Sequence, residues 1–355
     1  MGHFTATTLG LLEAVCLLAL VAGIACLGVA QTRRSRRLEL AEQRRTSLRE
    51  ALRREHRGTL LVACEDARDR QDVREDVRAV AGALAPASQR MLLAEAARQA
   101  GLDDALRDSL ASSDVIERGR ALGLLGLLRL ASCDELEPLL HDPDPEVRLV
   151  AVRAIASLDS GDGTRALLRA LGSDAIEPDR VVEQLARASA VPELVHALST
   201  SEHVAVRPLI AEALGLTRTL AGIAPLAALV RTGVEEERVR ACRALGRIAR
   251  PEVVPLLVEA LADDAWAVRA EAARGLTGLG DQSCVPDLER ALSDGAWWVR
   301  ANAAEALRSL GPVGLEALVR ASRSDDRVVA ARAREALADE AALDELARDD
   351  LDLAA

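Results

Sequence analysis

Six arginines recur at one point of a repeated pattern, and they are the first residues whose type and spacing suggest chemistry. They are Arg118, Arg148, Arg207, Arg240, Arg269 and Arg300. A row of exposed guanidinium groups suits phosphate binding, because each planar fork donates paired hydrogen bonds to an anion. Asp142, Asp263 and Asp294 stand five residues before the valine that precedes the matching arginine. Carboxylate partners for structural ion pairs are therefore also present, and the same aspartates are placed to cap a following helix.

Three tryptophans form the second chemical feature, since the chain has no Tyr and one Phe. Trp266 and Trp297 occupy the same position of the repeat, which favours packing between units. Trp298 has no such counterpart, and a tryptophan at a partly exposed helix start is typical of a protein interface. We therefore expect Trp266 and Trp297 to pack and Trp298 to contact a partner, and all three are interaction candidates.

Other reactive side chains show no spacing that indicates catalysis or a metal. The six cysteines contain no Cys-x-x-Cys pair and the five histidines no His-x-x-x-His pair, so buried free thiols are expected. The chain has no Lys, which excludes a phosphate-binding loop that depends on that residue. We predict no catalytic residue, no cofactor and no metal, and hence not an enzyme.

The amino-acid composition argues against further classes of function. Only 1% of the residues are aromatic, which argues against an aromatic-lined pocket and against base stacking. The formal net charge is −11, whereas nucleic-acid binding needs a basic surface. No nucleic-acid partner is expected.

The elements that position these residues are short helices in a repeat of about 31 residues. One half of the unit recurs at 254–261 and 285–292, and the other at 263–273 and 294–304. Apolar residues at i, i+3, i+4 and i+7 give each half one adhesive helical face. Each second helix is expected to end at a glycine that follows a leucine, in a left-handed stop. These glycines are Gly215, Gly246, Gly280 and Gly311.

The Asp-x-x-Trp-x-Val-Arg pattern in two copies resembles HEAT repeats, in the short bacterial form also seen in phycobilisome-lyase-type proteins. The resemblance covers residues 102–338, about eight helix pairs, with residues 60–101 as a degenerate helical region before them. It implies an all-α fold, a right-handed α-solenoid of helical hairpins. It also implies that the recurrent arginine pairs with the aspartate of its own turn or of a neighbouring unit. Repeat folds serve many functions, so the resemblance fixes no activity.

The N-terminal segment predicts one transmembrane helix before the solenoid. Residues 9–30 are apolar except for Glu13, and such a helix matches a bilayer core of roughly 30 Å. Arginines follow this helix directly, so the positive-inside rule places residues 1–8 outside and the body of the chain in the cytoplasm. The membrane-facing candidates are Glu13, Arg33, Arg34, Arg36 and Arg37. A cleaved secretory signal ending at Gly28-Val29-Ala30 is the competing interpretation, although a charged first region is missing.

Charge divides the remaining chain. Residues 33–57 carry +6, within an Arg-rich juxtamembrane segment over 31–59, while residues 58–355 carry −16. Leu38, Ala41, Leu48 and Leu52 form a weak heptad, so residues 38–52 are a candidate for weak self-association. A solvated helix that sets membrane orientation is the simpler interpretation. Residues 339–355 form an acidic C-terminal cap or tail.

These features together predict a scaffold anchored in the cell membrane as a single-pass protein. The solenoid would bind a protein partner, itself membrane-associated, at the cytoplasmic face, without catalysis. The alternative is a lyase-like or chaperone HEAT protein that acts on a modified or chromophore-bearing protein.

Overall fold

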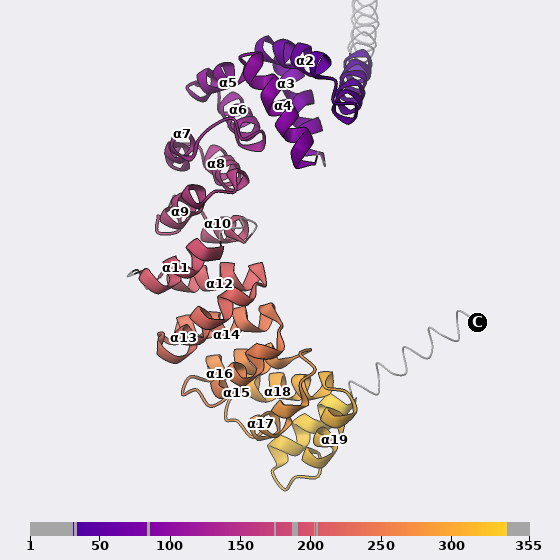
Figure 1. Ribbon diagram of the computed structural model, residues 1–355. Coiled ribbons are helices and arrows are strands. Elements are labelled where there is room, and N and C mark those ends of the chain that lie inside the picture. The colour runs from indigo at the N-terminus through magenta and orange to yellow at the C-terminus, as the bar shows by residue number, and fades with distance from the viewer. Residues whose placement is uncertain are drawn as a thin grey trace, which may run out of the picture. The chain divides into compact units, whose positions relative to one another are not determined.

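Helices make up the regular structure of the part of the chain that is described, and no strand occurs in it. The computed structural model describes residues 31–338, apart from 32–33, 84–85, 174, 187–190, 202 and 204 (Figure 1). The chain divides into two compact units, Met1–Ala131 and Ser132–Ala355. The boundary between these units falls inside the range predicted for the solenoid.

Unit 1 consists of a helix over 34–53 followed by five shorter helices. These are α2 (Arg57–Asp69), α3 (Gln71–Gly82), α4 (Ala87–Gln99), α5 (Leu102–Leu110) and α6 (Val115–Leu127). The helix over 34–53 buries Leu48, Ala51 and Leu52, which are at most 5% exposed. Its C-terminal half is therefore part of the core of unit 1.

Unit 2 repeats a pair of helices, the first often preceded by a 3₁₀ turn. The first helices are α7 (Cys133–Leu136) with η1 (Glu137–His141), α9 (Gly161–Ala170), α11 (Val191–Thr200), α13 (Ile223–Thr232) after η2 (Leu220–Gly222), α15 (Val254–Ala260) after η3 (Pro251–Val253), α17 (Val285–Ala291) after η4 (Gln282–Cys284), and α19 (Pro312–Ala321). The second helices are α8 (Pro145–Leu158), α10 (Pro178–Leu185), α12 (Arg207–Thr217), α14 (Glu235–Ile248), α16 (Trp266–Leu276), α18 (Trp297–Ser309) and a helix over 327–338.

The stacking follows from the sequence pattern. In α14 the buried residues Ala241, Ala244, Leu245 and Ile248 stand at i, i+3, i+4 and i+7, so one face of the helix is apolar. Neither helix of a pair can cover such a face alone, and α12, α14, α16 and α18 contact one another in sequence order, as Figure 1 shows. The core of unit 2 is the continuous layer between neighbouring pairs.

Three of the four predicted glycine stops are wrong. Gly311 follows the C-cap of α18 with positive φ, as expected. Gly280 also has positive φ, but α16 ends at Leu276 and this glycine lies in the following loop, while Gly215 and Gly246 lie inside α12 and α14. The left-handed residues at the ends of these two helices are Arg218 and Ala249. The two internal glycines instead permit close approach, since a Cβ on Gly246 would lie 2.7 Å from the Cα of Gly275.

The predicted helix caps are also corrected. Asp142, Asp263 and Asp294 accept hydrogen bonds from the backbone N–H two residues later, at 2.9, 2.8 and 2.8 Å. That N–H belongs to the residue just before each helix, so these aspartates bind the loop rather than the helical N–H groups. In α8 the cap is Asp144, which accepts from Glu146 and Val147.

The transmembrane prediction falls on residues 9–30, which lie outside the described residues, as do Glu13, Arg33 and the acidic tail. None of the helices that the structure describes combines the length and apolarity needed to cross a bilayer. Arg34, Arg36 and Arg37 are described and exposed.

Candidate functional site

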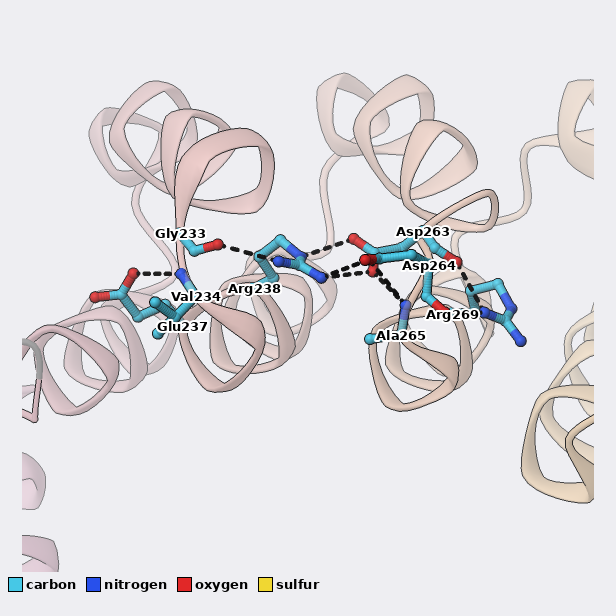
Figure 2. Close-up of polar contacts among 8 residues, drawn as sticks. All are labelled: Gly233, Val234, Glu237, Arg238, Asp263, Asp264, Ala265 and Arg269. Carbon is cyan, nitrogen blue, oxygen red and sulfur yellow. Dashed lines mark hydrogen bonds and ion pairs between the residues drawn. The ribbon is translucent and has the colours of Figure 1, made fainter.

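The most regular polar feature of unit 2 is a row of arginines, of which Arg238 and Arg269 each join one loop to the next. Arg238 of α14 donates from Nε and Nη2 to the two carboxylate oxygens of Asp263, at 2.8 and 2.9 Å (Figure 2). Its Nη2 also donates to Asp264 at 2.7 Å, and its Nη1 donates to the Gly233 carbonyl at 3.1 Å. One guanidinium therefore binds its own loop and connects it to the loop of the following repeat.

Arg269 repeats this arrangement one unit later. It donates from Nε and Nη2 to Asp294 at 2.6 and 3.0 Å, and from Nη1 to the carbonyls of Asp263 and Asp264. The hydrogen bond from Arg269 holds the pKa of the Asp294 carboxyl below its ordinary value. Both forks are filled by protein groups, so these arginines serve structure here rather than phosphate binding.

Glu237 replaces the aspartate where the pattern lacks one. Thr232 stands where Asp263 stands in the next unit, six residues before the ladder arginine. Glu237, at the register of the core residue Val268, points back and accepts from the N–H of Val234 at 2.9 Å, as Figure 2 shows. Its other oxygen lies 3.2 Å from Nη1 of Arg207, an ion pair without hydrogen-bond geometry. The buried glutamate thus performs both tasks of the missing aspartate.

Over α12, α14, α16 and α18 the ladder therefore consists of Arg207, Arg238, Arg269 and Arg300, so Arg238 replaces the predicted Arg240. Arg240 stands two residues beyond the true position and pairs instead with Glu212 of α12. Glu212 also accepts from Arg247 at 3.0 Å. Sequence reasoning missed Arg238 because the Val-Arg pair at 239–240 imitates the repeat. Counting six residues from the loop start would have identified it.

The earlier arginines bind backbone carbonyls. Arg118 donates from Nη1 to the carbonyls of Ser112 and Ser113, at 2.9 and 3.2 Å. Arg148 donates to the carbonyls of Asp142 and Pro143, and reaches forward from Nε to the Ala175 carbonyl at 2.7 Å. Both side chains close the loop that precedes their own helix.

A second row of ion pairs joins the second helices directly. Glu271 of α16 accepts from Arg243 of α14 at 2.7 Å and from Arg274 at 2.5 Å. Burial opposes ionisation of Glu271, but the two arginines outweigh it, and the pKa of this carboxyl lies below its ordinary value. Charges on these helices are therefore largely paired, which leaves no strongly basic stripe along them.

The tryptophans stand out against this paired surface. Trp266 begins α16, and Trp297 and Trp298 begin α18. They are 50%, 49% and 58% exposed, so the packing between repeats that we expected of Trp266 and Trp297 does not bury either ring. The Trp297 and Trp298 rings meet edge to face with centroids 4.7 Å apart, and the Arg332 guanidinium lies 5.2 Å from the Trp297 centroid.

The three residues, called the tryptophan surface below, are the candidate functional site. Exposed apolar side chains scattered singly are ordinary, but large aromatic ones gathered at the starts of neighbouring helices are typical of protein-binding surfaces. Val234 and Val328, near the starts of α14 and of the helix over 327–338, are also exposed. The surface can bury apolar area and donate hydrogen bonds from indole N–H groups.

The Arg-rich helix of unit 1 is not simply solvated. Asp76 of α3 is 1% exposed, and it accepts from Nε of Arg44 at 2.6 Å and from Nε of Arg45 at 2.8 Å. Leu48 and Leu52 are buried within unit 1 while Leu38 is exposed. Part of the apolar face proposed for self-association over 38–52 is therefore already buried, because Leu48 and Leu52 pack within unit 1.

Cys64, Cys133, Cys242 and Cys284 are buried free thiols, and burial raises the pKa of Cys64 and of Cys242 to about 12. Within the described residues, no cluster of His, Cys, Asp and Glu has the geometry of a metal site. Cys16 and Cys26 lie outside them.

Family models match three stretches of the chain. The model described as HEAT repeats matches residues 224–277 and 257–338, and the model described as HEAT repeat matches residues 133–161. These stretches include the pairs α13 with α14, α15 with α16 and α17 with α18, together with the three tryptophans. Residues 133–161 and 224–338 thus match HEAT repeats, as the sequence pattern indicates. Among curated proteins, none matches the chain.

Several solved structures of other proteins are similar to this chain. Kap121p bound to Pho4p has a TM-score of 0.45 and 15% identity, over 82% of this chain and 39% of that one. The complex of CpcE and CpcF of phycocyanin lyase from Nostoc has a TM-score of 0.30 and 21% identity, over 67% and 94%. Human deoxyhypusine hydroxylase has a TM-score of 0.29 and 21% identity, over 66% and 94%. At such scores these likenesses say nothing about the function of this chain.

Proposed function

We propose that this chain is a non-catalytic scaffold that binds a protein partner through the tryptophan surface. The observation that carries the proposal is the exposure of Trp298, which is 58% exposed and has no counterpart in the repeat pattern. Large aromatic side chains supply much of the binding energy at protein interfaces, because they bury a large area with few rotatable bonds. The paired charges of the neighbouring helices suit a surface that recognises a protein rather than a polyanion.

The setting is the cytoplasmic face of the cell membrane, with residues 9–30 as the anchor and the partner itself membrane-associated. The support is the apolar sequence of residues 9–30 followed by arginines. Anchoring both proteins in one membrane raises their effective concentration, so a modest interface of a few aromatic residues is sufficient.

Crosslinking in cells tests this function. A photoreactive residue at position 298 is expected to capture one discrete partner protein, and the same residue at position 116 is the matched control. Ile116 is likewise an exposed apolar residue at the second position of a second helix, but it belongs to unit 1. Equal capture at both positions contradicts a specific surface at Trp298.

Substitution separates binding from packing. Trp298→Ala is expected to reduce partner capture at least tenfold, since truncating an interface anchor costs about 2 kcal/mol or more. The melting temperature is expected to stay nearly unchanged, because an exposed side chain contributes little to folding. A large thermal loss with normal capture shows that Trp298 packs instead. A bound chromophore in the purified protein favours the lyase-like alternative.

A further inference from the structure

The arginine ladder ends at Arg300 with an unfilled fork. Arg300 donates from Nη1 to the carbonyls of Asp294 and Gly295, at 2.7 and 3.0 Å. Arg238 and Arg269 also bind a carboxylate of the following unit through Nε and Nη2. Within the described residues, Arg300 has no such carboxylate.

Ser324 explains the break. It stands two residues before the cap of the helix over 327–338, as Asp294 stands two residues before the cap of α18. Its hydroxyl accepts from the N–H of Asp326 at 3.2 Å, which reproduces the loop contact that Asp294 makes with Ala296. A hydroxyl lacks the second oxygen and the charge that a guanidinium fork binds. The loop contact is kept while the ion pair is lost.

The unfilled fork belongs to the same helix as the tryptophan pair. Arg300 follows Trp297 by three residues in α18, and residues at this spacing lie on one helical face. Arg332 covers the Trp297 ring from the next second helix, and Val328 is exposed at the start of that helix. The end of unit 2 therefore combines a vacant cation, an additional guanidinium and exposed apolar groups. Its natural ligand is a segment that carries carboxylates and leucines together.

Such a segment continues directly from the helix over 327–338. Residues 339–355 contain seven carboxylates and one arginine. Leu343, Leu346, Ala347 and Leu351 stand at i, i+3, i+4 and i+8, the pattern of one apolar helical face. As a helix, the segment would measure about 25 Å at 1.5 Å per residue, and position 338 lies only about 9 Å along the helix axis from Arg332. Attachment to the same chain supplies an effective concentration in the millimolar range.

We propose that residues 339–355 dock on this end of unit 2, with one carboxylate on Nε and Nη2 of Arg300 and leucines over Trp297 and Trp298. The segment takes the place of the next repeat, which would otherwise supply both the aspartate and the apolar cover. It also competes with the partner proposed above for Trp298, so this regulatory consequence rests on the proposed function. The docking itself does not.

Intrinsic fluorescence reads the docking without any label. The chain contains three tryptophans and no tyrosine, so its emission arises almost wholly from the tryptophan surface. In the full-length chain, Leu343→Ser with Leu346→Ser and Leu351→Ser is expected to raise acrylamide quenching roughly twofold and to shift the emission to longer wavelength, because indole rings become exposed. Leu220→Ser, at an exposed leucine outside this surface, is the control and is expected to change nothing.

Two further variants test the carboxylate contact by opposite means. Arg300→Gln removes the cation, whereas Ser324→Asp restores the internal partner and fills the fork. With the tail unchanged, both variants are expected to raise acrylamide quenching of the tryptophan fluorescence. Arg300→Gln is expected to lower the melting temperature, whereas Ser324→Asp is expected to raise it. Arg323→Gln, at an exposed arginine of the same end, is expected to leave the quenching unchanged.

Three results overturn the proposal. One is unchanged quenching in the leucine variant, whose sites lie outside the described core and whose folding is checked by circular dichroism. Another is a leucine effect with no effect of Arg300→Gln or Ser324→Asp. The third is quenching that depends on protein concentration, because a second copy then supplies the segment. Partner capture is not measured in this experiment, so the docking and the proposed function can each fail alone.

Discussion

Glu237 shows at the residue scale how one side chain keeps a contact after the usual residue for it has been lost. It is 1% exposed, binds the N–H of Val234 and pairs with Arg207. A glutamate at the register of a core valine looks like a defect in the sequence. The physical reason for it is visible only in the structure, where the longer side chain reaches the loop that Thr232 cannot serve.

Glu237→Ala is expected to destabilise the protein by about 3 kcal/mol, because it leaves the Arg207 guanidinium without its carboxylate and the Val234 N–H unbonded. The neighbouring Glu236 is exposed in the same helical turn, so Glu236→Ala is the matched control and is expected to change stability by less than about 0.5 kcal/mol. Urea denaturation measures both. Equal losses would show that helix N-terminal charge, not the buried pair, is what matters.

Asp294 makes stability depend on pH. Its pKa is lower in the folded protein than the ordinary value of about 3.9, chiefly through the hydrogen bond from Arg269. The pair therefore stabilises the fold above that value, and the contribution is lost as the pH falls through the folded pKa. The melting temperature of Asp294→Asn is expected to lie below that of the wild type at neutral pH and to converge with it in acid. A difference in melting temperature between the two proteins that stays constant down to about pH 2 contradicts this linkage.

At the element scale, close contact between second helices decides how the repeats stack. α14 and α16 approach until Gly246 and Gly275 face each other, and Gly215 approaches Ala244 in the same way. The sequence pattern treats Gly246 as a helix end, because a glycine after a leucine is a common stop signal. The helix continues to Ile248 and ends at Ala249 in a left-handed conformation.

Gly246→Ala is expected to destabilise the protein by about 1–3 kcal/mol, because the added methyl meets backbone that cannot move without separating two helices. Gly119 provides the opposite case, since a Cβ there meets nothing within 4 Å. Gly119→Ala in α6 is therefore expected to stabilise by up to about 1 kcal/mol through helix propensity. Thermal melting of both variants checks the pair, and a gain from Gly246→Ala would contradict close helix approach.

At the scale of the whole molecule, the net charge of −11 is an average over unlike parts. Residues 33–57 carry +6, but part of that charge serves folding, since Arg44 and Arg45 bind the buried Asp76. Among the other exposed arginines of this segment, Arg34, Arg36 and Arg37 lie nearest the predicted anchor. An anionic leaflet would attract them by about 1 kcal/mol each.

Deletion of residues 1–32 is expected to move the protein from the membrane to the soluble fraction without unfolding it, because the described core begins after this segment. Fractionation and circular dichroism of the truncated chain measure the two effects. Leu48→Asp in the truncated chain is expected to destabilise unit 1, because this leucine is 3% exposed and the substitution places a carboxylate in the core. Membrane retention of the truncated chain contradicts the assignment of residues 9–30 as the anchor.

The sequence by itself determined the helical repeat, the positions of most helices and the recurrence of Arg269 and Asp294 within the repeat, because local periodicity and short-range spacing encode them. Only the tertiary structure decided that Arg238 and not Arg240 belongs to the ladder, that Glu237 replaces an aspartate, and that Trp266 and Trp297 are exposed. Those facts depend on contacts between neighbouring repeats, where the length of a side chain and the distance between two backbones determine which residues meet. The unfilled fork of Arg300 is of the same kind, since Ser324 makes the loop contact that Asp294 makes one repeat earlier but offers no carboxylate.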